Sequence, residues 1–260
     1  MIVEGQKRTL CHAYAVQRHA AGKSRDTVWT ELLLLRTALN WAVDNKIIAR
    51  APAVWIPSKG PGRNVMITED EAARLIEGCG MPHIRTFVLI ALCTAARRGA
   101  ILELEWSRVD FVRGVIDFNC GEKRGILDSG YQKGRAIAPM NALLRAALLE
   151  AKAGARTGHV IEWNGQRVAD VKTGFTAAVK RAGLEGRRIS PHVLRHATAS
   201  WLADGDVDMR KIQKLLGHST QKVTETIYAN KASTHYLSGA TDAIGARLKL
   251  VSPAAKEDAA

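Results

Sequence analysis

Long hydrophobic runs and cysteines are both scarce in this chain of 260 residues. No apolar run approaches the ~20 residues that a membrane-spanning helix needs, and the opening sequence MIVEGQKRTL lacks the hydrophobic segment of a secretory signal. The four cysteines are widely spaced and form no C-x-x-C pair. That spacing argues against a zinc site or a disulfide framework and fits a reducing compartment. We therefore expect a cytoplasmic protein with no membrane association.

Acidic residues are also few relative to basic ones. The chain has 25 Asp and Glu against 38 Lys and Arg, which gives a formal net charge of +13. A surplus of this size implies a polyanionic partner, either nucleic acid or an anionic membrane surface, and the lack of membrane segments favours nucleic acid. Hydrophobic residues make up 47% of the sequence, enough for a packed core in one large or two modest domains.

Periodicity predicts mainly helices and one small sheet. A helical pattern runs from about residue 12 to 56, and Ser24 can cap a helix in it whose apolar stripe is Val28, Leu32, Leu35, Leu39 and Ala42. Segments 109–111, 115–118 and 136–138 favour an antiparallel sheet, and Asn164-Gly165 favours a hairpin turn. Residues 57–63, PSKGPGR, form a proline- and glycine-rich break between two domains.

The richest stretch in polar chemistry runs from residue 190 to 230. Ser190 followed by Pro191 predicts a helix start with a hydroxyl cap, and Gly205 predicts a left-handed helix end. The helix carries three polar residues at spacings of three and four on one face: His192, Arg195 and His196.

A second helix follows directly in the sequence. Asp206 or Asp208 can cap it, and Gly217 can end it. Its inward residues are predicted to be Ile212, Leu215 and Leu216. His218 then lies just past a helix terminus, and Tyr228 lies ten residues beyond that histidine.

This combination resembles the tyrosine recombinases, the phage integrase family. The family's second sequence box reads H-x-x-R-H, then L-G-H-S, then a tyrosine, and here these are His192, Arg195 and His196, residues 216–219, and Tyr228. The string TAARRGAILELEW resembles its first box, T-G-x-R-x-x-E-I-L-x-L-x-W, and the register favours Arg97 over Arg98. Two positions depart from the pattern: Ala95 replaces a glycine, and Ala100 replaces an acidic residue.

The resemblance implies a fold that is mainly α with a small antiparallel β-sheet. A helical, SAM-like core-binding domain would cover residues 1–58, a linker 59–67, and an α+β tyrosine recombinase catalytic domain 68–250. The last ten residues, 251–260, have the composition of a disordered tail. Double-stranded DNA is the implied partner, with a homotetramer on the synapsed sites and a possible accessory DNA-bending protein.

Cleaving a phosphodiester without a metal requires clustered cations around the developing charge. Arg97 and Arg195 are suited because a guanidinium stays charged and offers a planar fork to phosphate oxygens, and His218 would add a hydrogen bond. Tyr228 would attack as nucleophile, conserving bond energy in a 3′-phosphotyrosine, with His192 as its base.

Two assignments within this scheme remain open. In the family a hairpin lysine reaches the scissile site, which would be Lys133 here, with Lys123 as the competitor. Tyr236 is an alternative nucleophile, although Tyr228 has the family's local context.

The leading hypothesis is therefore a site-specific recombinase that needs no cofactor, metal or ATP. Metal hydrolysis is disfavoured because the pair His192 and His196 lacks the intervening glutamate of H-E-x-x-H. Two alternatives remain. One is a catalytically weakened, integrase-like DNA-binding protein, suggested by Ala100. The other is a type IB topoisomerase-like enzyme, which shares the nucleophile and the cations.

Overall fold

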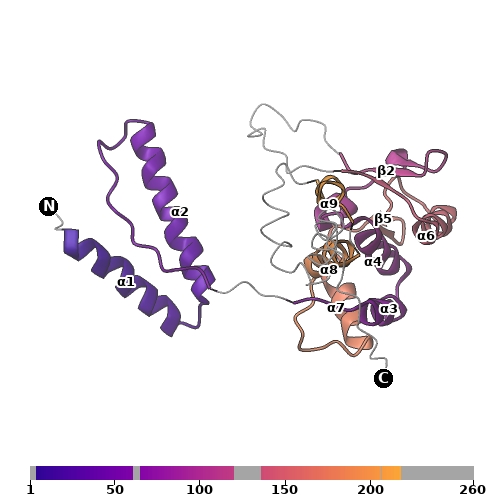
Figure 1. Cartoon of the computed structure of the whole chain (residues 1–260), viewed down its shortest axis with the longest axis horizontal. Coiled ribbons are helices and arrows are strands. Elements are labelled where there is room, and N and C mark those ends of the chain that lie inside the picture. Colours follow the sequence, from indigo (N-terminus) through magenta and orange to yellow (C-terminus); the bar gives the residue numbers. More distant parts are fainter. Residues whose placement is uncertain (1–3, 61–64, 120–135, 206, 218–260) are drawn as a thin grey trace, which may run out of the picture. The chain divides into compact units, whose positions relative to one another are not determined.

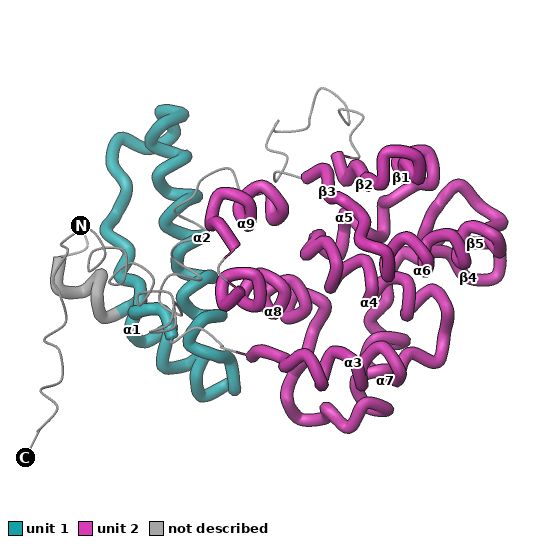
Figure 2. Tube along the Cα trace, turned by 45° about the vertical axis from the view of Figure 1, so that its right-hand side comes forward, with its two compact units in different colours: residues 1–64 teal, residues 65–260 magenta. Residues whose placement is uncertain are grey.

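The computed structural model describes residues 4–60, 65–119, 136–205 and 207–217. The chain divides into two compact units, residues 1–64 and 65–260, which Figure 2 shows in teal and magenta. The division falls just after the predicted proline- and glycine-rich break. Each unit is described by itself.

Unit 1 contains a pair of helices, α1 (Glu4–Ala20) and α2 (Arg25–Asp44). Ser24 caps α2 as predicted, its hydroxyl accepting a hydrogen bond from the Thr27 amide. Glu31 of α2 ties the helices together because it accepts bonds from the Arg18 guanidinium and the Tyr14 hydroxyl of α1. The Arg18 bond is the main reason why the pKa of Glu31 lies below its usual value. The predicted helical pattern was too long, since α2 ends at Asp44 rather than near residue 56.

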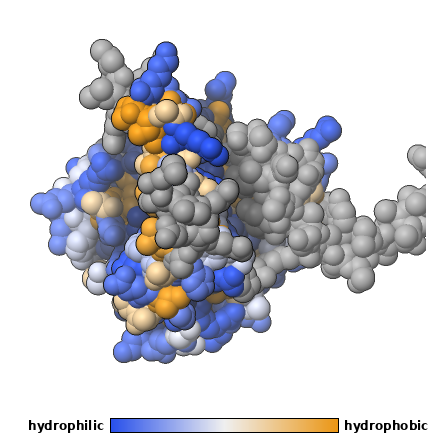
Figure 3. Space-filling model, turned by 90° about the vertical axis from the view of Figure 1, so that its left-hand side faces the viewer, coloured by the Kyte–Doolittle hydropathy of each residue, from blue (hydrophilic) through white to orange (hydrophobic). Residues whose placement is uncertain are grey.

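The helix pair of unit 1 buries only part of the predicted apolar stripe. Val28 and Leu32 are buried, but Leu35 is exposed, so its predicted core position was wrong. Other large hydrophobic side chains of this unit are also exposed: Leu10, Val16, Leu34, Trp41 and Ile47. Figure 3, which views the molecule from the left-hand side of Figure 1, shows hydrophobic residues in orange among hydrophilic ones on that face. Two helices alone can cover only a narrow stripe of each other.

Unit 2 is built from seven described α-helices and two small sheets. The helices are α3 (Glu69–Glu77), α4 (Pro82–Thr94), α5 (Arg98–Leu102), α6 (Ala142–Ala153), α7 (Lys172–Arg181), α8 (Pro191–Asp204) and α9 (Met209–Leu216). A three-stranded antiparallel sheet has the order β1 (Val109–Asp110), β2 (Val115–Asp117) and β3 (Ile137–Pro139). A hairpin pairs β4 (Glu162–Trp163) with β5 (Gln166–Arg167). The predicted mainly helical fold with a small antiparallel sheet is confirmed.

Helix α4 is the centre of the core in unit 2. Its apolar residues point in all directions, and nine of its side chains are buried, including Phe87, Val88 and Ile90. A helix that is apolar all round must be covered on every side. It packs against α8, α6, α5 and α3, and Figure 1 shows α6 and α8 on opposite sides of it.

Several helix ends of unit 2 have local caps, and the predictions for α9 are confirmed. Thr68 and Glu71 form a reciprocal capping box at α3, Asp208 caps α9, and Gly217 ends α9 in the left-handed conformation. Two predictions for α8 were wrong in detail. The Ser190 side chain makes no capping bond. Gly205 has a φ of −88°, so α8 does not end in the left-handed conformation.

The hairpin turn at Asn164-Gly165 is confirmed, with both residues at positive φ. Among the described residues, no helix has both the length and the apolar character needed to cross a bilayer.

Candidate active site

The candidate site is built on the turn that follows α4. Ala95 ends the helix in the left-handed conformation, with a φ of 52°, and is fully buried. The Thr94 hydroxyl steadies the turn because it donates to the Ile90 carbonyl at 2.6 Å and accepts from the Ala96 amide at 3.3 Å. The turn redirects the chain so that Arg97 becomes the residue that precedes α5.

Arg195 of α8 links this turn to the end of α9. Its guanidinium donates from Nη1 to the Ala95 carbonyl and from Nη2 to the Leu216 carbonyl, both at 2.7 Å. The side chain is only 4% exposed. Both acceptors are carbonyls at helix C-termini, where intrahelical partners are missing and the helix dipole is negative. The buried cation is therefore compensated by main-chain dipoles of two helices.

Arg97 and Arg195 line one small cavity. Its other lining residues include Ala100 of α5, Phe118 and Ala136 beside the sheet, and Leu216 of α9. The cavity measures about 10 Å³. That is roughly the space of one water molecule. Ala100, which stands where the family pattern has an acidic residue, places a methyl group in the wall of this cavity.

Arg98 lies outside this arrangement. Its guanidinium forms an ion pair of 3.2 Å with Asp170, and both side chains are 53% exposed. Arg98 does not line the cavity. Of the two neighbouring arginines, Arg97 lines the cavity and Arg98 does not.

The two histidines of α8 are in contact with each other. The rings of His192 and His196 meet edge to face, with centroids 4.4 Å apart. His192 is exposed and His196 is half-buried. Thr198, two residues further along, donates to the Leu92 carbonyl at 2.9 Å and fixes α8 against α4. Among the described residues, no group of three or more His, Cys, Asp or Glu side chains is placed to hold a metal ion.

The remaining predicted site residues lie outside the described residues: Lys123, Lys133, His218, Tyr228 and Tyr236. Gly217 is the last described residue before His218, and its left-handed conformation ends α9 there. The structure thus brings together Arg97 and Arg195, with His192 on the same helix as Arg195. No sequence pattern points to the Ala95 and Leu216 carbonyls, because every residue carries such a group.

Comparisons with known proteins identify the family of this chain. The model of the phage integrase family matches residues 66–235. The integrase of Salmonella phage P22 is 27% identical over 229 residues, which cover 83% of this chain and 55% of that protein. The chain therefore spans about half the length of that relative.

Solved structures show the same fold. The Tn1549 transposon integrase in complex with circular intermediate DNA has a TM-score of 0.73 at 19% identity, covering 91% of this chain and 85% of that chain. The lambda integrase tetramer bound to a Holliday junction has a TM-score of 0.64 at 19% identity, covering 87% and 64%. Because the family model matches residues 66–235, which are most of this chain, the chain belongs to the phage integrase family.

Proposed function

We propose that the protein is a site-specific DNA recombinase that cleaves and rejoins DNA through a 3′-phosphotyrosine at Tyr228. The observation that carries the proposal is the pair of guanidinium groups, Arg97 and Arg195, at one cavity. One of them is held rigidly by main-chain carbonyls. Membership of the phage integrase family and the net charge of +13 support the same reaction class.

The arginines would stabilise the charge that develops on the scissile phosphate. Two neighbouring cations, of which Arg195 is held in place in advance, can bind its non-bridging oxygens, so less reorganisation is needed in the transition state. Because Arg195 already donates to two carbonyls, its orientation does not depend on bound DNA. His218 would add a hydrogen bond to the same phosphate.

The covalent step would proceed as a single displacement. The Tyr228 phenol oxygen attacks the scissile phosphorus while its proton passes to His192. The bond from phosphorus to the 5′-oxygen breaks, and Lys133 protonates that oxygen. A 5′-hydroxyl from a second strand then attacks the phosphotyrosine, so no metal, cofactor or ATP is consumed.

The partners follow from the same mechanism. Double-stranded DNA would be the substrate, with unit 1 acting as the core-binding domain and unit 2 as the catalytic domain. Strand exchange between two duplexes needs four active sites, which supports a homotetramer, and the related lambda integrase is a tetramer on a Holliday junction. An accessory DNA-bending protein belongs to the same proposal.

Ala100 favours a second candidate, a DNA-binding protein of the same family with weakened catalysis. A carboxylate at this wall of the cavity would pair with a neighbouring arginine, and a methyl group cannot. If Ala100 limits catalysis, Ala100→Asp will raise the cleavage rate without changing DNA affinity. If neither the intact protein nor Ala100→Asp cleaves DNA while both bind it, the protein is the DNA-binding member with weakened catalysis.

A suicide substrate tests the proposal directly. The target can be found by mapping cleavage on a library of the flanking genomic DNA, and a nick beside the cleavage position then traps the covalent adduct. The intact protein should form an adduct, Tyr236→Phe should still form it, and Tyr228→Phe should not. Binding to the target without any adduct in the intact protein would refute the proposal.

Two further substrates resolve the remaining assignments. A bridging 5′-phosphorothiolate has a leaving group that needs no proton. It should therefore restore cleavage to whichever of Lys133→Ala and Lys123→Ala has lost it, and not to Tyr228→Phe. Supercoiled DNA without the target site distinguishes the type IB topoisomerase-like alternative, because only such an enzyme would relax it.

A further inference from the structure

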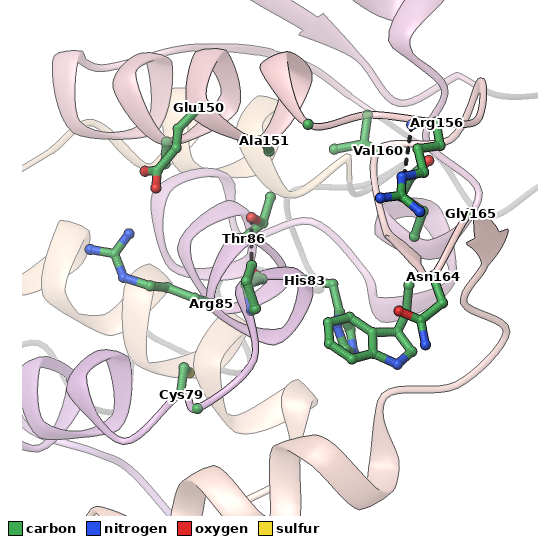
Figure 4. Close-up of a pocket in the computed structure, with 16 residues that line it drawn as sticks. Cys79, His83, Arg85, Thr86, Glu150, Ala151, Arg156, Val160, Asn164 and Gly165 are labelled. Carbon is green, nitrogen blue, oxygen red and sulfur yellow. Dashed lines mark hydrogen bonds between the residues drawn. The ribbon is translucent and has the colours of Figure 1, made fainter.

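A second cavity lies in unit 2 among α4, α6 and the β4–β5 hairpin. Its volume is about 500 Å³. Small-molecule sites typically measure roughly 300–1,000 Å³. Figure 4 shows 16 lining residues, none of which lines the Arg97–Arg195 cavity. The two cavities are therefore distinct.

An unsatisfied histidine nitrogen marks one wall of this cavity. Nδ1 of His83 is buried and has no hydrogen-bond partner in the described structure. Buried polar atoms are nearly always bonded. This nitrogen is closed off from the cavity as the ring now lies, so a ligand would bond it after a turn of the His83 side chain. Burial lowers the pKa of the His83 imidazole, and a neutral imidazole can accept or donate one bond at Nδ1.

A flat aromatic surface lies beside that nitrogen. The Trp163 ring meets the His83 ring at 5.0 Å between centroids, and the tryptophan remains 42% exposed. The hairpin holds this indole in place. The Glu162 carboxylate next to it accepts bonds from the amides of Arg156 at 2.8 Å and Thr157 at 2.6 Å. Both oxygens of the Glu162 carboxylate therefore accept hydrogen bonds within the loop and are not available to bind a ligand.

Three exposed charged side chains line the cavity: Arg85, Glu150 and Arg156. Figure 4 shows Arg85 and Glu150 on one side of His83, and Arg156 with Asn164 on the other. An apolar ligand would desolvate these charges without pairing them, which is costly. Inorganic phosphate would pair with an arginine but leave the rings of His83 and Trp163 unused.

We propose that this cavity binds a nucleotide, with the base stacked on Trp163 and bonded to His83, and the phosphate at Arg156 or Arg85. A nucleotide combines a planar heterocycle that carries ring donors and acceptors with an anionic group, and so satisfies each of these features at once. The ligand is either a free nucleotide or an unpaired nucleotide of a DNA strand. The proposal does not depend on DNA cleavage at Tyr228.

Calorimetric titration of the full chain with deoxyadenosine monophosphate tests the site. Binding should be saturable with one nucleotide per chain. Trp163→Ala should weaken it about tenfold or more because it removes the stacking surface, whereas Trp163→Phe should largely retain it. His83→Phe keeps the ring, lacks Nδ1 and should weaken binding several-fold.

Matched controls separate this site from general attraction to a basic protein. Arg156→Gln and Arg85→Gln each remove one charge at the cavity, and Arg113→Gln removes one at an exposed position outside it. At least one of the first two should weaken binding, and Arg113→Gln should not. Trp41→Ala removes an exposed tryptophan of unit 1 and should have no effect. Thermal melting of each variant verifies folding.

Titrations with other ligands identify the source of the nucleotide, and some of their results would overturn the proposal. If a short single-stranded oligodeoxynucleotide binds more tightly than the mononucleotide and keeps its dependence on Trp163, the source is an unpaired strand. Equal or weaker binding identifies the free nucleotide. Binding of N-acetylphenylalanine in place of the nucleotide would indicate a peptide site. If the nucleotide shows no saturable binding at millimolar concentration, the cavity is only a water-filled cleft. Either result would overturn the proposal, whatever the result of the suicide-substrate assay.

Discussion

Replacing Arg195 with methionine should strongly destabilise unit 2, in addition to any effect on catalysis. Methionine keeps an unbranched apolar stem but has no donor, so the Ala95 and Leu216 carbonyls would both lose their 2.7 Å bonds in a buried position. A hydrogen bond to a charged group contributes about 1.5–3 kcal/mol, so we expect a loss of about 3–6 kcal/mol in the free energy of unfolding. That is a large part of the ~5–15 kcal/mol typical of a folded domain.

Pulsed hydrogen exchange across a urea series measures this loss on peptides of α4 and α8, which report on unit 2. Arg98→Met is the matched control, since it removes an exposed ion pair, and we expect a change of at most ~1 kcal/mol. Arg195→Lys keeps the charge but cannot reproduce the planar fork, so it should fall between the two. A loss below ~1 kcal/mol for Arg195→Met would refute the reasoning, because the guanidinium would then contribute nothing to the packing of α4, α8 and α9.

Other expectations concern packing and cysteine reactivity. A Cβ at Gly174 would lie 2.6 Å from Cδ1 of the buried Ile84, whereas one at Gly99 meets nothing within 4 Å. Gly174→Ala should therefore destabilise the protein by ~1–2 kcal/mol in thermal or urea unfolding, and Gly99→Ala should be neutral or stabilising; the reverse order would contradict the described packing. Burial raises the pKa of Cys79 to about 11. At pH 8 its alkylation by iodoacetamide, followed by peptide mass spectrometry, should be about 100-fold slower than that of a thiol with a pKa near 9, and a rate close to that of a free peptide thiol would exclude the burial.

Local signals made much of the fold predictable. Asp208, one of two candidate caps, and Gly217 were identified from residue type and spacing, because a cap depends on atoms within a few residues. The Asn164-Gly165 turn was predicted for the same reason. Leu35 was placed wrongly because burial depends on which elements cover a helix, and periodicity does not specify them.

The candidate site could be predicted only in part. The family's sequence boxes identified Arg97 and Arg195, and the structure places both at one cavity. The partners of Arg195 are backbone carbonyls 100 and 21 residues away in sequence, which no pattern of side chains reveals. The second cavity was not predicted, because His83 and Trp163 are 80 residues apart and their contact depends on tertiary packing.

The left-handed conformation of Ala95 has a consequence for how unit 2 responds to mutation. An L-residue other than glycine pays about 1–2 kcal/mol for this backbone, and Ala95 keeps it while fully buried. The packing of the surrounding helices must offset this cost for the turn to keep its conformation. Substitutions that loosen α4 against α8 should therefore release this turn first, and the spacing between the two arginines should change before the rest of the unit unfolds.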